Sequence, residues 1–301
     1  MTSKKLAIID IGSKTVRLSI YEEKDSGHMD EIKRDKVSLR LSQHVVNGSL
    51  TKYGVEQLIF VLNDFEKIIH DHEVEEIECI ATAAIRNANN QKEILLAVDE
   101  HTPFTIRLLS GEEEAEYGLL AITQSIKITD GVAIDLGGGS TEVTLFRNRK
   151  LIKTVSIPFG VVTLAKSFSD GLPISDEALY QLTTYVKQEL SSIVWIKDVG
   201  LPIIGIGGSV RLIGNYSLAT KQIKCDLNGY SISESEMNHI VKLMTDMSSE
   251  ELIKWAKDNA DLTMPALTVL SELLKWTDSE KLICCTKGIK DGLIYSKMQA
   301  N

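Results

Sequence analysis

Two stretches of this chain follow the same pattern: Ile8-Ile9-Asp10-Ile11-Gly12-Ser13-Lys14-Thr15-Val16-Arg17-Leu18 and Ala133-Ile134-Asp135-Leu136-Gly137-Gly138-Gly139-Ser140-Thr141-Glu142-Val143. Each consists of an apolar strand, an aspartate, a glycine-containing loop with hydroxyl side chains, and a second apolar strand. The aspartates are 125 residues apart (135 − 10), which is too long for a solenoid repeat and indicates a duplicated domain. Two such loops facing each other would hold a phosphate chain from both ends.

The length of 301 residues favours one large or two medium domains. The composition, with 43% hydrophobic and 25% charged residues, is that of an ordinary globular protein. A net charge of −9 argues against DNA as a partner. No apolar run is long enough to cross a bilayer, and the N-terminus does not read as a signal peptide, so we expect a cytoplasmic protein without a membrane partner. The four cysteines, none in a CxxC pair, are predicted to be reduced core residues.

Apolar runs alternate with amphipathic segments along the whole chain, which predicts an α/β fold. Strands are expected at 4–9, 16–22, 31–41, 77–81, 104–109, 131–135, 142–147, 151–157, 202–206 and 281–285. Helices are expected to begin at Thr51, Gly111 and Ser175, and to cover 233–246, 249–257, 263–276 and 288–298. The domain boundaries that follow are 1–125 and 126–286, with a last helix at about 287–301 packing back on the first domain.

Three glycine-containing turns follow predicted strands, and such turns can present backbone N–H groups to phosphate. The residues expected to bind phosphate in them are Gly12, Ser13, Lys14 and Thr15; Gly137, Gly138, Gly139, Ser140 and Thr141; and Gly207, Gly208 and Ser209. Neither of the first two turns fits a P-loop or a dinucleotide fingerprint, because a strand follows each loop. The third enters the amphipathic segment 210–216 and is typical of an anion site at a helix N-terminus.

Asp10 and Asp135 end buried strands directly before these loops. A carboxylate at such a place suits a Mg²⁺ ion that bridges phosphate oxygens. An aspartate that caps its own turn is the structural alternative.

The order of motifs resembles the exopolyphosphatase and guanosine pentaphosphate phosphohydrolase (Ppx/GppA) family of the actin, Hsp70 and sugar kinase superfamily. The resemblance covers essentially the whole chain. Its motifs are Asp10–Ser13, Ala81–Arg86, Ser110–Ala115, Ile134–Glu142, Ser156–Val162, Gly205–Arg211 and Lys287–Leu293.

The resemblance implies two actin-like (ribonuclease H-like) domains with an active site in the cleft between them. It implies Mg²⁺-dependent hydrolysis of the terminal phosphate of inorganic polyphosphate, with pppGpp as the alternative substrate. Glu114 aligns with the glutamate that activates water, Asp135 and Glu142 with catalytic acids that also serve the metal, and Arg86 with a phosphate-gripping arginine. Asp10 completes the expected metal set.

The chain departs from the family pattern at three places. Lys14-Thr15 stands where Asn-Ser is usual, and Thr163 stands where an arginine is common. The chain ends soon after Leu293, where longer relatives continue, which leads us to expect activity on short chains. A non-catalytic (p)ppGpp or polyphosphate sensor, a sugar- or acid-kinase-like phosphotransferase, and a homodimeric state are left open by the sequence.

Overall fold

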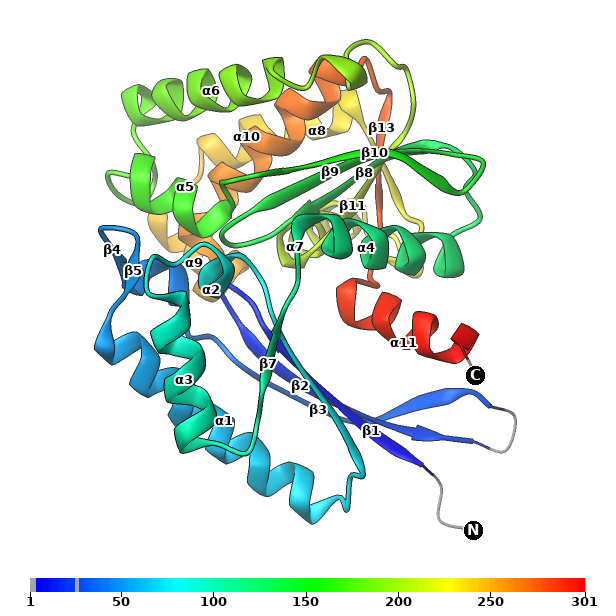
Figure 1. Ribbon diagram of the computed structural model, residues 1–301. Helices are drawn as coiled ribbons and strands as arrows, with labels where there is room; N and C mark the ends of the chain where they lie inside the picture. The colour runs from blue at the N-terminus through cyan, green and yellow to red at the C-terminus, as the bar shows by residue number, and fades with distance from the viewer. Residues whose placement is uncertain (1–3, 25–26, 301) are drawn as a thin grey trace. The chain divides into compact units, whose positions relative to one another are not determined.

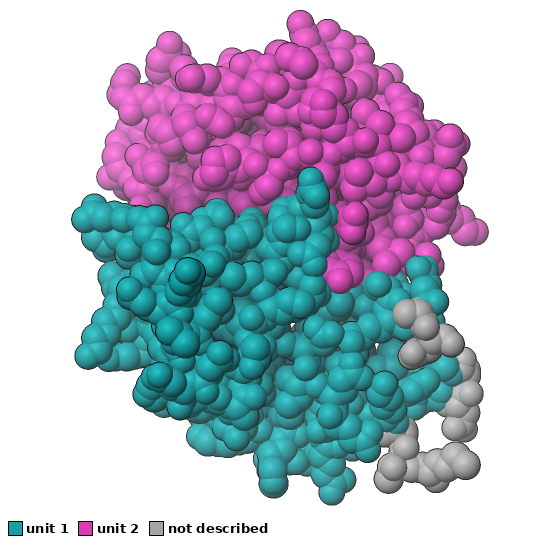
Figure 2. Space-filling model, viewed as in Figure 1, with its two compact units in different colours: residues 1–114, 293–301 teal, residues 115–292 magenta. Residues whose placement is uncertain are grey.

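The computed structural model describes residues 4–24 and 27–300 and divides the chain into two compact units (Figures 1 and 2). The first unit contains residues 1–114 and 293–301, coloured teal in Figure 2, and the second contains residues 115–292, coloured magenta. Each unit is built on one mixed β-sheet with helices on both faces, as expected for the predicted α/β fold.

The sheet of the first unit has the order β3-β2-β1-β6-β7. Its strands are β1 (Lys5–Ile11), β2 (Val16–Glu23), β3 (Met29–Val37), β6 (Glu76–Ala81) and β7 (Ile106–Leu108). The first three form an antiparallel meander, whereas β6 and β7 run parallel to β1. This arrangement brings the carboxyl ends of β1, β6 and β7 to the same edge of the sheet.

Helices α1 (Lys52–Asp71) and α3 (Gln91–His101) cover one face of this sheet with a shared apolar core. The predicted start of α1 is confirmed, because the Thr51 side chain accepts a hydrogen bond from the Gly54 N–H. The opposite face carries the last helix, α11 (Ile289–Ala300), whose Lys297 forms ion pairs of 2.6 Å with Glu76 and 2.8 Å with Glu78. The short elements are η1 (Leu41–His44), β4 (Val45–Val46), β5 (Ser49–Leu50) and α2 (Ala83–Arg86).

The sheet of the second unit has the order β10-β9-β8-β11-β13-β12. Its strands are β8 (Gly131–Leu136), β9 (Thr141–Arg147), β10 (Lys150–Ile157), β11 (Ile203–Ile206), β12 (Ser231–Ser233) and β13 (Lys281–Cys284). Its helical elements are α4 (Gly111–Ser125), α5 (Val161–Phe168), α6 (Asp176–Ser191), η2 (Val194–Ile196), α7 (Gly208–Thr220), α8 (Glu234–Thr245), α9 (Ser249–Ala256), η3 (Lys257–Asn259) and α10 (Ala260–Thr277). α10 lies almost wholly inside the larger core, and α4 packs on the other face through Leu119 and Ile122.

The two sheets repeat one topology, which supports the predicted duplication. A meander of three antiparallel strands is followed in each unit by strands parallel to the first, β6 and β7 in one unit and β11 and β13 in the other. Both hairpin turns are closed by the same bond, from Gly12 N to Thr15 O and from Gly137 N to Ser140 O, each 3.1 Å long.

The observed elements add to the prediction in places. Helices α3 and α5 and strand β12 were not predicted, and β3 ends at Val37 rather than near residue 41. The predicted boundary at residue 125 falls at the end of α4, whereas the compact units divide at 114/115. The physical reason is that Leu119 and Ile122 belong to the apolar cluster of the second unit. The first residues of α11, up to Gly292, fall in the second unit as well.

The prediction that all four cysteines lie in the core is wrong for Cys225, which is exposed. Cys79, Cys284 and Cys285 are buried, and burial raises the pKa of each thiol, to about 12 for Cys284. Since the thiolate is the reactive form, we expect a thiol reagent such as DTNB to titrate one equivalent in the native protein and four after denaturation. Rapid modification of a second thiol in the native protein would contradict this burial pattern.

No helix within 4–24 and 27–300 combines the length and the apolar character that crossing a bilayer requires.

Candidate active site

Three loops of the first unit meet at the carboxyl edge of its sheet. Ile11 pairs with Ala81, and Ala81 pairs with Leu108, so the chain leaves β1, β6 and β7 at the same level. The loop 12–15, the segment 82–86 and the start of α4 follow these strands. Ligands of open α/β sheets bind at this edge. Six of the predicted site residues of this unit lie in these segments: Gly12, Ser13, Lys14, Thr15, Arg86 and Glu114.

The three glutamates at the start of α4 have different surroundings. Glu112 is exposed, whereas Glu113 belongs to a capping arrangement in which its carboxylate accepts the Ser110 N–H at 2.8 Å and its N–H bonds the Ser110 hydroxyl. These bonds to Ser110, with help from Arg107, lower the pKa of Glu113. Glu114 is only 3% exposed, so it is the one acid of the three that the fold withdraws from solvent.

The Arg86 guanidinium holds Glu114 in place. One of its nitrogens, Nη1, donates to the Glu114 carboxylate and also to the Leu109 carbonyl, at 2.7 Å from the latter. Arg86 ends the short helix α2 after β6, and Glu114 begins α4 after β7, so the pair ties two of the three edge loops together. A buried carboxylate with a fixed cationic partner is a typical functional arrangement.

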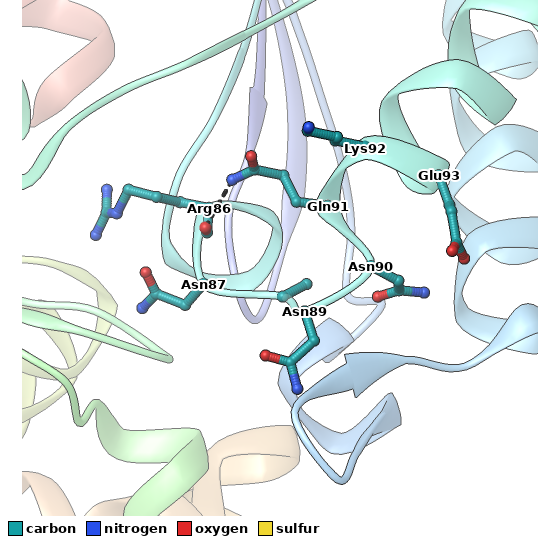
Figure 3. A pocket seen from close by; sticks show the side chains of 8 residues that line it. Arg86, Asn87, Asn89, Asn90, Gln91, Lys92 and Glu93 are labelled. Carbon is teal, nitrogen blue, oxygen red and sulfur yellow. Dashed lines mark hydrogen bonds between the residues drawn. The ribbon is translucent and has the colours of Figure 1, made fainter.

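A polar pocket lies beside Arg86 and is lined by residues 86–93 (Figure 3). The side-chain amides of two of these residues form hydrogen bonds with the backbone of the protein. Gln91 Nε2 donates to the Arg86 carbonyl at 2.7 Å, and Asn90 forms two bonds of 2.9 Å with the backbone of Leu50. Figure 3 shows the Arg86 guanidinium extending away from Gln91 and Lys92. The pocket wall therefore supports Arg86 from its backbone side.

Loop 12–15 is anchored through its carbonyl groups. The Ser13 carbonyl accepts from Ser42 N at 3.1 Å, and the Lys14 carbonyl accepts from Arg40 N at 2.8 Å. A Cβ on Gly12 would lie 3.1 Å from the Thr15 carbonyl oxygen that closes the turn, which is a tight contact and favours glycine at this position. Ser13 is buried and Lys14 is half-buried, which leaves the lysine side chain partly accessible.

Asp10, expected to bind metal, has a protein cation as a partner. Arg17 stands directly opposite in the β1–β2 ladder, and its Nη1 donates to Asp10 Oδ2 at 3.1 Å. The hairpin register could have revealed this pair, because Asp10 and Arg17 are symmetric about the predicted turn. The charge of Asp10 is thus balanced within the hairpin.

The second unit gathers its predicted residues in the same way. Asp135 pairs with Ile206, and Gly205 pairs with Cys284, so loop 137–140, the turn Gly207–Ser209 and the segment after β13 share one edge. The turn Gly207–Ser209 begins the 13-residue helix α7, which has no acidic residue in its first turn. An anion at this helix N-terminus would meet a favourable dipole.

Loop 137–140 is held by helix α5, which the sequence did not predict. The N–H groups of Val161 and Val162 donate to the carbonyls of Gly137 and Gly138, both at 2.9 Å. No hydrogen bond among the described residues uses the N–H of Gly138 or Gly139. The carbonyls of the loop are therefore occupied by protein, while two of its amides remain for a ligand.

Asp135 and Glu142 face each other across the β8–β9 ladder, at the positions that Asp10 and Arg17 occupy in the first unit. Glu142 is 3% exposed and accepts a hydrogen bond from the Ser156 hydroxyl at 2.8 Å. Like charges directly opposite on two strands repel each other. The first hairpin thus pairs an acid with a base, and the second pairs two acids.

Two carboxylates at this position fit a hard divalent cation, because Mg²⁺ prefers one or two carboxylates together with substrate phosphate. The residues that the structure describes contain no group of three or more His, Cys, Asp and Glu side chains placed to hold a metal. Of the expected set, Asp135 and Glu142 lie in the second unit and Asp10 in the first.

Thr141 does not fit the predicted role of its side chain. It is fully buried, and its hydroxyl donates to the Phe159 carbonyl at 2.7 Å. The Thr141 hydroxyl therefore donates its proton to the backbone and not to a phosphate. This bond holds the segment before α5 against β9. A neighbouring Ser140 is also buried, at 4% exposure.

Gly207 has a backbone that only glycine adopts easily, with φ at +110°. A Cβ there would lie 2.9 Å from the Leu136 carbonyl and 3.5 Å from the Asp135 carboxylate. We expect Gly207→Ala to lower the free energy of unfolding by about 2 kcal/mol. Gly208→Ala is the matched control, since nothing lies within 4 Å of its Cβ position. Equal chemical denaturation curves for the two variants would contradict this geometry.

The chain matches the Ppx/GppA phosphatase family over residues 19–301. Exopolyphosphatase 1 of Mycobacterium tuberculosis strain H37Rv is 25% identical to it, over 98% of this chain and 89% of the relative. The putative exopolyphosphatase of Haemophilus influenzae is 24% identical, over 97% of this chain and 91% of the relative.

Solved structures agree with this relationship. The Ppx/GppA family member of Aquifex aeolicus is 26% identical, with a TM-score of 0.81 over 99% of this chain and 98% of that chain. An exopolyphosphatase from Cytophaga hutchinsonii has a TM-score of 0.90 over 99% and 98% of the two chains; at 19% identity it supports the fold alone. The predicted fold class, two α/β domains of the actin-like type, is confirmed. The match of residues 19–301, the relatives that align over nearly the whole chain and the shared fold together show that this chain belongs to the Ppx/GppA phosphatase family.

Proposed function

We propose that this protein hydrolyses the terminal phosphate of inorganic polyphosphate, with Glu114 as the residue that orients or deprotonates the attacking water. The observation that carries the proposal is the buried Glu114, which Arg86 fixes at the same sheet edge as loop 12–15. Hydrolysis of a phosphoanhydride depends on positioning and charge neutralisation more than on covalent chemistry. The fixed carboxylate of Glu114 would position the water, and loop 12–15 would neutralise the charge of the phosphate.

Glu114 would accept a hydrogen bond from the water, and Arg86 would keep the carboxylate aimed during the reaction. Arg86 can do this because its second bond, to the Leu109 carbonyl, ties it to the backbone. A base of this kind contributes about 10²- to 10⁴-fold to a rate. Arg86 is also the residue best suited to contact a phosphate oxygen, since a guanidinium has several donors.

Backbone amides would donate hydrogen bonds to the phosphate oxygens of the substrate, and Lys14 would neutralise part of their negative charge. The amides of Gly138 and Gly139 and the first turn of α7 are the donors in the second unit. Lys14 adds a point charge in the first unit, in the loop that follows β1. We propose that this charge favours a polyanionic substrate, and that short chains are accepted.

Asp135 and Glu142 would hold Mg²⁺, whereas the carboxylate of Asp10, the third acid of the expected set, bonds Arg17 within its own hairpin. The ion would supply charge neutralisation to phosphate oxygens. The facing carboxylates support this assignment, because they place two acidic side chains opposite each other at the edge of the sheet. The same residues serve the metal and the reaction in this proposal.

The test is phosphate release from polyphosphates of defined length, with pppGpp and ATP in parallel and with Mg²⁺ varied. We expect Mg²⁺-dependent release of orthophosphate from short polyphosphates at a higher kcat/KM than from either nucleotide. A higher kcat/KM on pppGpp would overturn the choice of substrate in favour of a pppGpp 5′-phosphohydrolase. Binding without release on every substrate would indicate a sensor, and release that requires an acceptor other than water would indicate a phosphotransferase.

A further inference from the structure

The N-terminal N–H groups of helix α5 bind loop 137–140. The first N–H groups of a helix have no partner within the helix and commonly bind anions. In α5 they bind backbone instead: Val161 N donates to the Gly137 carbonyl, and Val162 N and Thr163 N donate to the Gly138 carbonyl, at 2.9, 2.9 and 3.2 Å. The N-terminus of α5 is thus occupied by the carbonyls of the loop.

This contact fixes the orientation of two peptide groups. A peptide plane carries its carbonyl and the next N–H on opposite sides, so holding the carbonyls of Gly137 and Gly138 also directs the N–H groups of Gly138 and Gly139. A rotated peptide would present a carbonyl oxygen to a phosphate and repel it. Glycine peptides rotate more freely than others, so three glycines in a row need an external restraint.

Two features hold α5 against the loop: a close backbone contact at Gly160 and hydrogen bonds of the Thr163 side chain. A Cβ on Gly160 would lie 2.4 to 2.5 Å from the backbone atoms of residues 137–139, so this glycine lets the two segments touch. Thr163 Oγ1 accepts the Gly160 N–H at 2.8 Å and donates to the Gly160 carbonyl at 2.9 Å. The Thr163 hydroxyl therefore holds the residue on which α5 rests against the loop.

We propose that Thr163 is a positioning residue: through Gly160 and the N-terminus of α5 it orients the Gly138 and Gly139 amides toward the polyphosphate substrate. This inference rests on the proposed function, because it assigns those amides to phosphate. It also gives a role to Thr163, which stands out in the sequence only because an arginine is common at this position. An arginine there would offer a cation, whereas threonine offers a short side chain that closes the cap.

The test compares Thr163→Val, which keeps the shape but loses both hydroxyl bonds, with Thr163→Ser, which keeps the hydroxyl. We expect Thr163→Val to weaken binding of tripolyphosphate about tenfold, measured by calorimetry in a Glu114→Gln background, and Thr163→Ser to bind as the parent does. Amide hydrogen exchange at Gly138 and Gly139 is expected to accelerate in the valine variant only.

Ser175→Ala is the matched control, because Ser175 caps the neighbouring helix α6 through Ala178 N at 3.2 Å and does not bond the loop. It is expected to lower the melting temperature about as much as Thr163→Val while leaving tripolyphosphate binding unchanged. Equal binding by Thr163→Val and the parent, or equal weakening by Thr163→Ser and Thr163→Val, would overturn the positioning role alone. A parent that binds no tripolyphosphate and releases no phosphate would overturn the proposed function, and this inference with it.

Discussion

Replacing Glu114 by glutamine is expected to lower kcat for phosphate release by about a thousandfold while the fold stays intact. Glutamine keeps the shape of the side chain and an oxygen that can accept from Arg86, so the buried pair loses a charge but not its geometry. Alanine would instead remove the acceptor oxygen of the Arg86 bond together with the charge, and breaking a buried pair in that way costs about 3–5 kcal/mol of stability. The glutamine variant therefore separates chemistry from folding.

The control for this variant is Glu112→Gln, which makes the same change two residues earlier in α4 at an exposed position. It is expected to leave kcat and KM essentially unchanged. Circular dichroism and a melting curve of each variant would establish that both are folded. Wild-type turnover in Glu114→Gln would mean that Glu114 serves only as a structural partner of Arg86.

Glu142→Gln is expected to abolish the stabilisation of the protein by Mg²⁺ and to reduce turnover at least a hundredfold. A ligand at one hundred times its Kd stabilises the folded state by about 2.7 kcal/mol, which thermal melting detects readily. Without Mg²⁺ the same variant should be as stable as the wild type or slightly more stable, because it removes a like-charge pair worth roughly 0.2–1 kcal/mol.

Asp10→Asn is the matched comparison in the first unit. It removes the carboxylate that Arg17 contacts, so we expect it to lower stability by about 1 kcal/mol whether or not Mg²⁺ is present. Without Mg²⁺, only Asp10→Asn is thus expected to lower the stability of the protein. A Mg²⁺-induced rise in melting temperature that persists in Glu142→Gln and disappears in Asp10→Asn would place the ion on the first hairpin and contradict our assignment.

The sequence predicted the sheet strands well because their signals are local. Both hairpins have continuous apolar runs on either side of a glycine loop, and α1 has buried residues at helical spacing from Leu58 to Ile69. Helix α5 was missed because it is eight residues long and begins with two valines, which favour strands. Its role depends on contact with residues 137–139, which lie more than twenty positions away in the chain.

The candidate site was predictable as a set of loops but not as a set of contacts. The positions of Arg86, Glu114 and the glycine turns followed from the motifs, and the structure places them after parallel strands at one edge of each sheet. The burial of the Thr141 hydroxyl did not follow, because it depends on the path of residues 157–160. The contrast between the Asp10–Arg17 and Asp135–Glu142 pairs could have been predicted, because each pair is symmetric about its glycine turn.

In the proposed reaction, water attacks the terminal phosphorus of polyphosphate with the help of Glu114. The most direct measurement is hydrolysis of tetrapolyphosphate in ¹⁸O-labelled water with Mg²⁺, followed by mass analysis of the products. We expect one ¹⁸O atom in the released orthophosphate, none in the remaining tripolyphosphate, and almost no product from Glu114→Gln. Label in the shortened chain, or equal product from the glutamine variant, would contradict this mechanism.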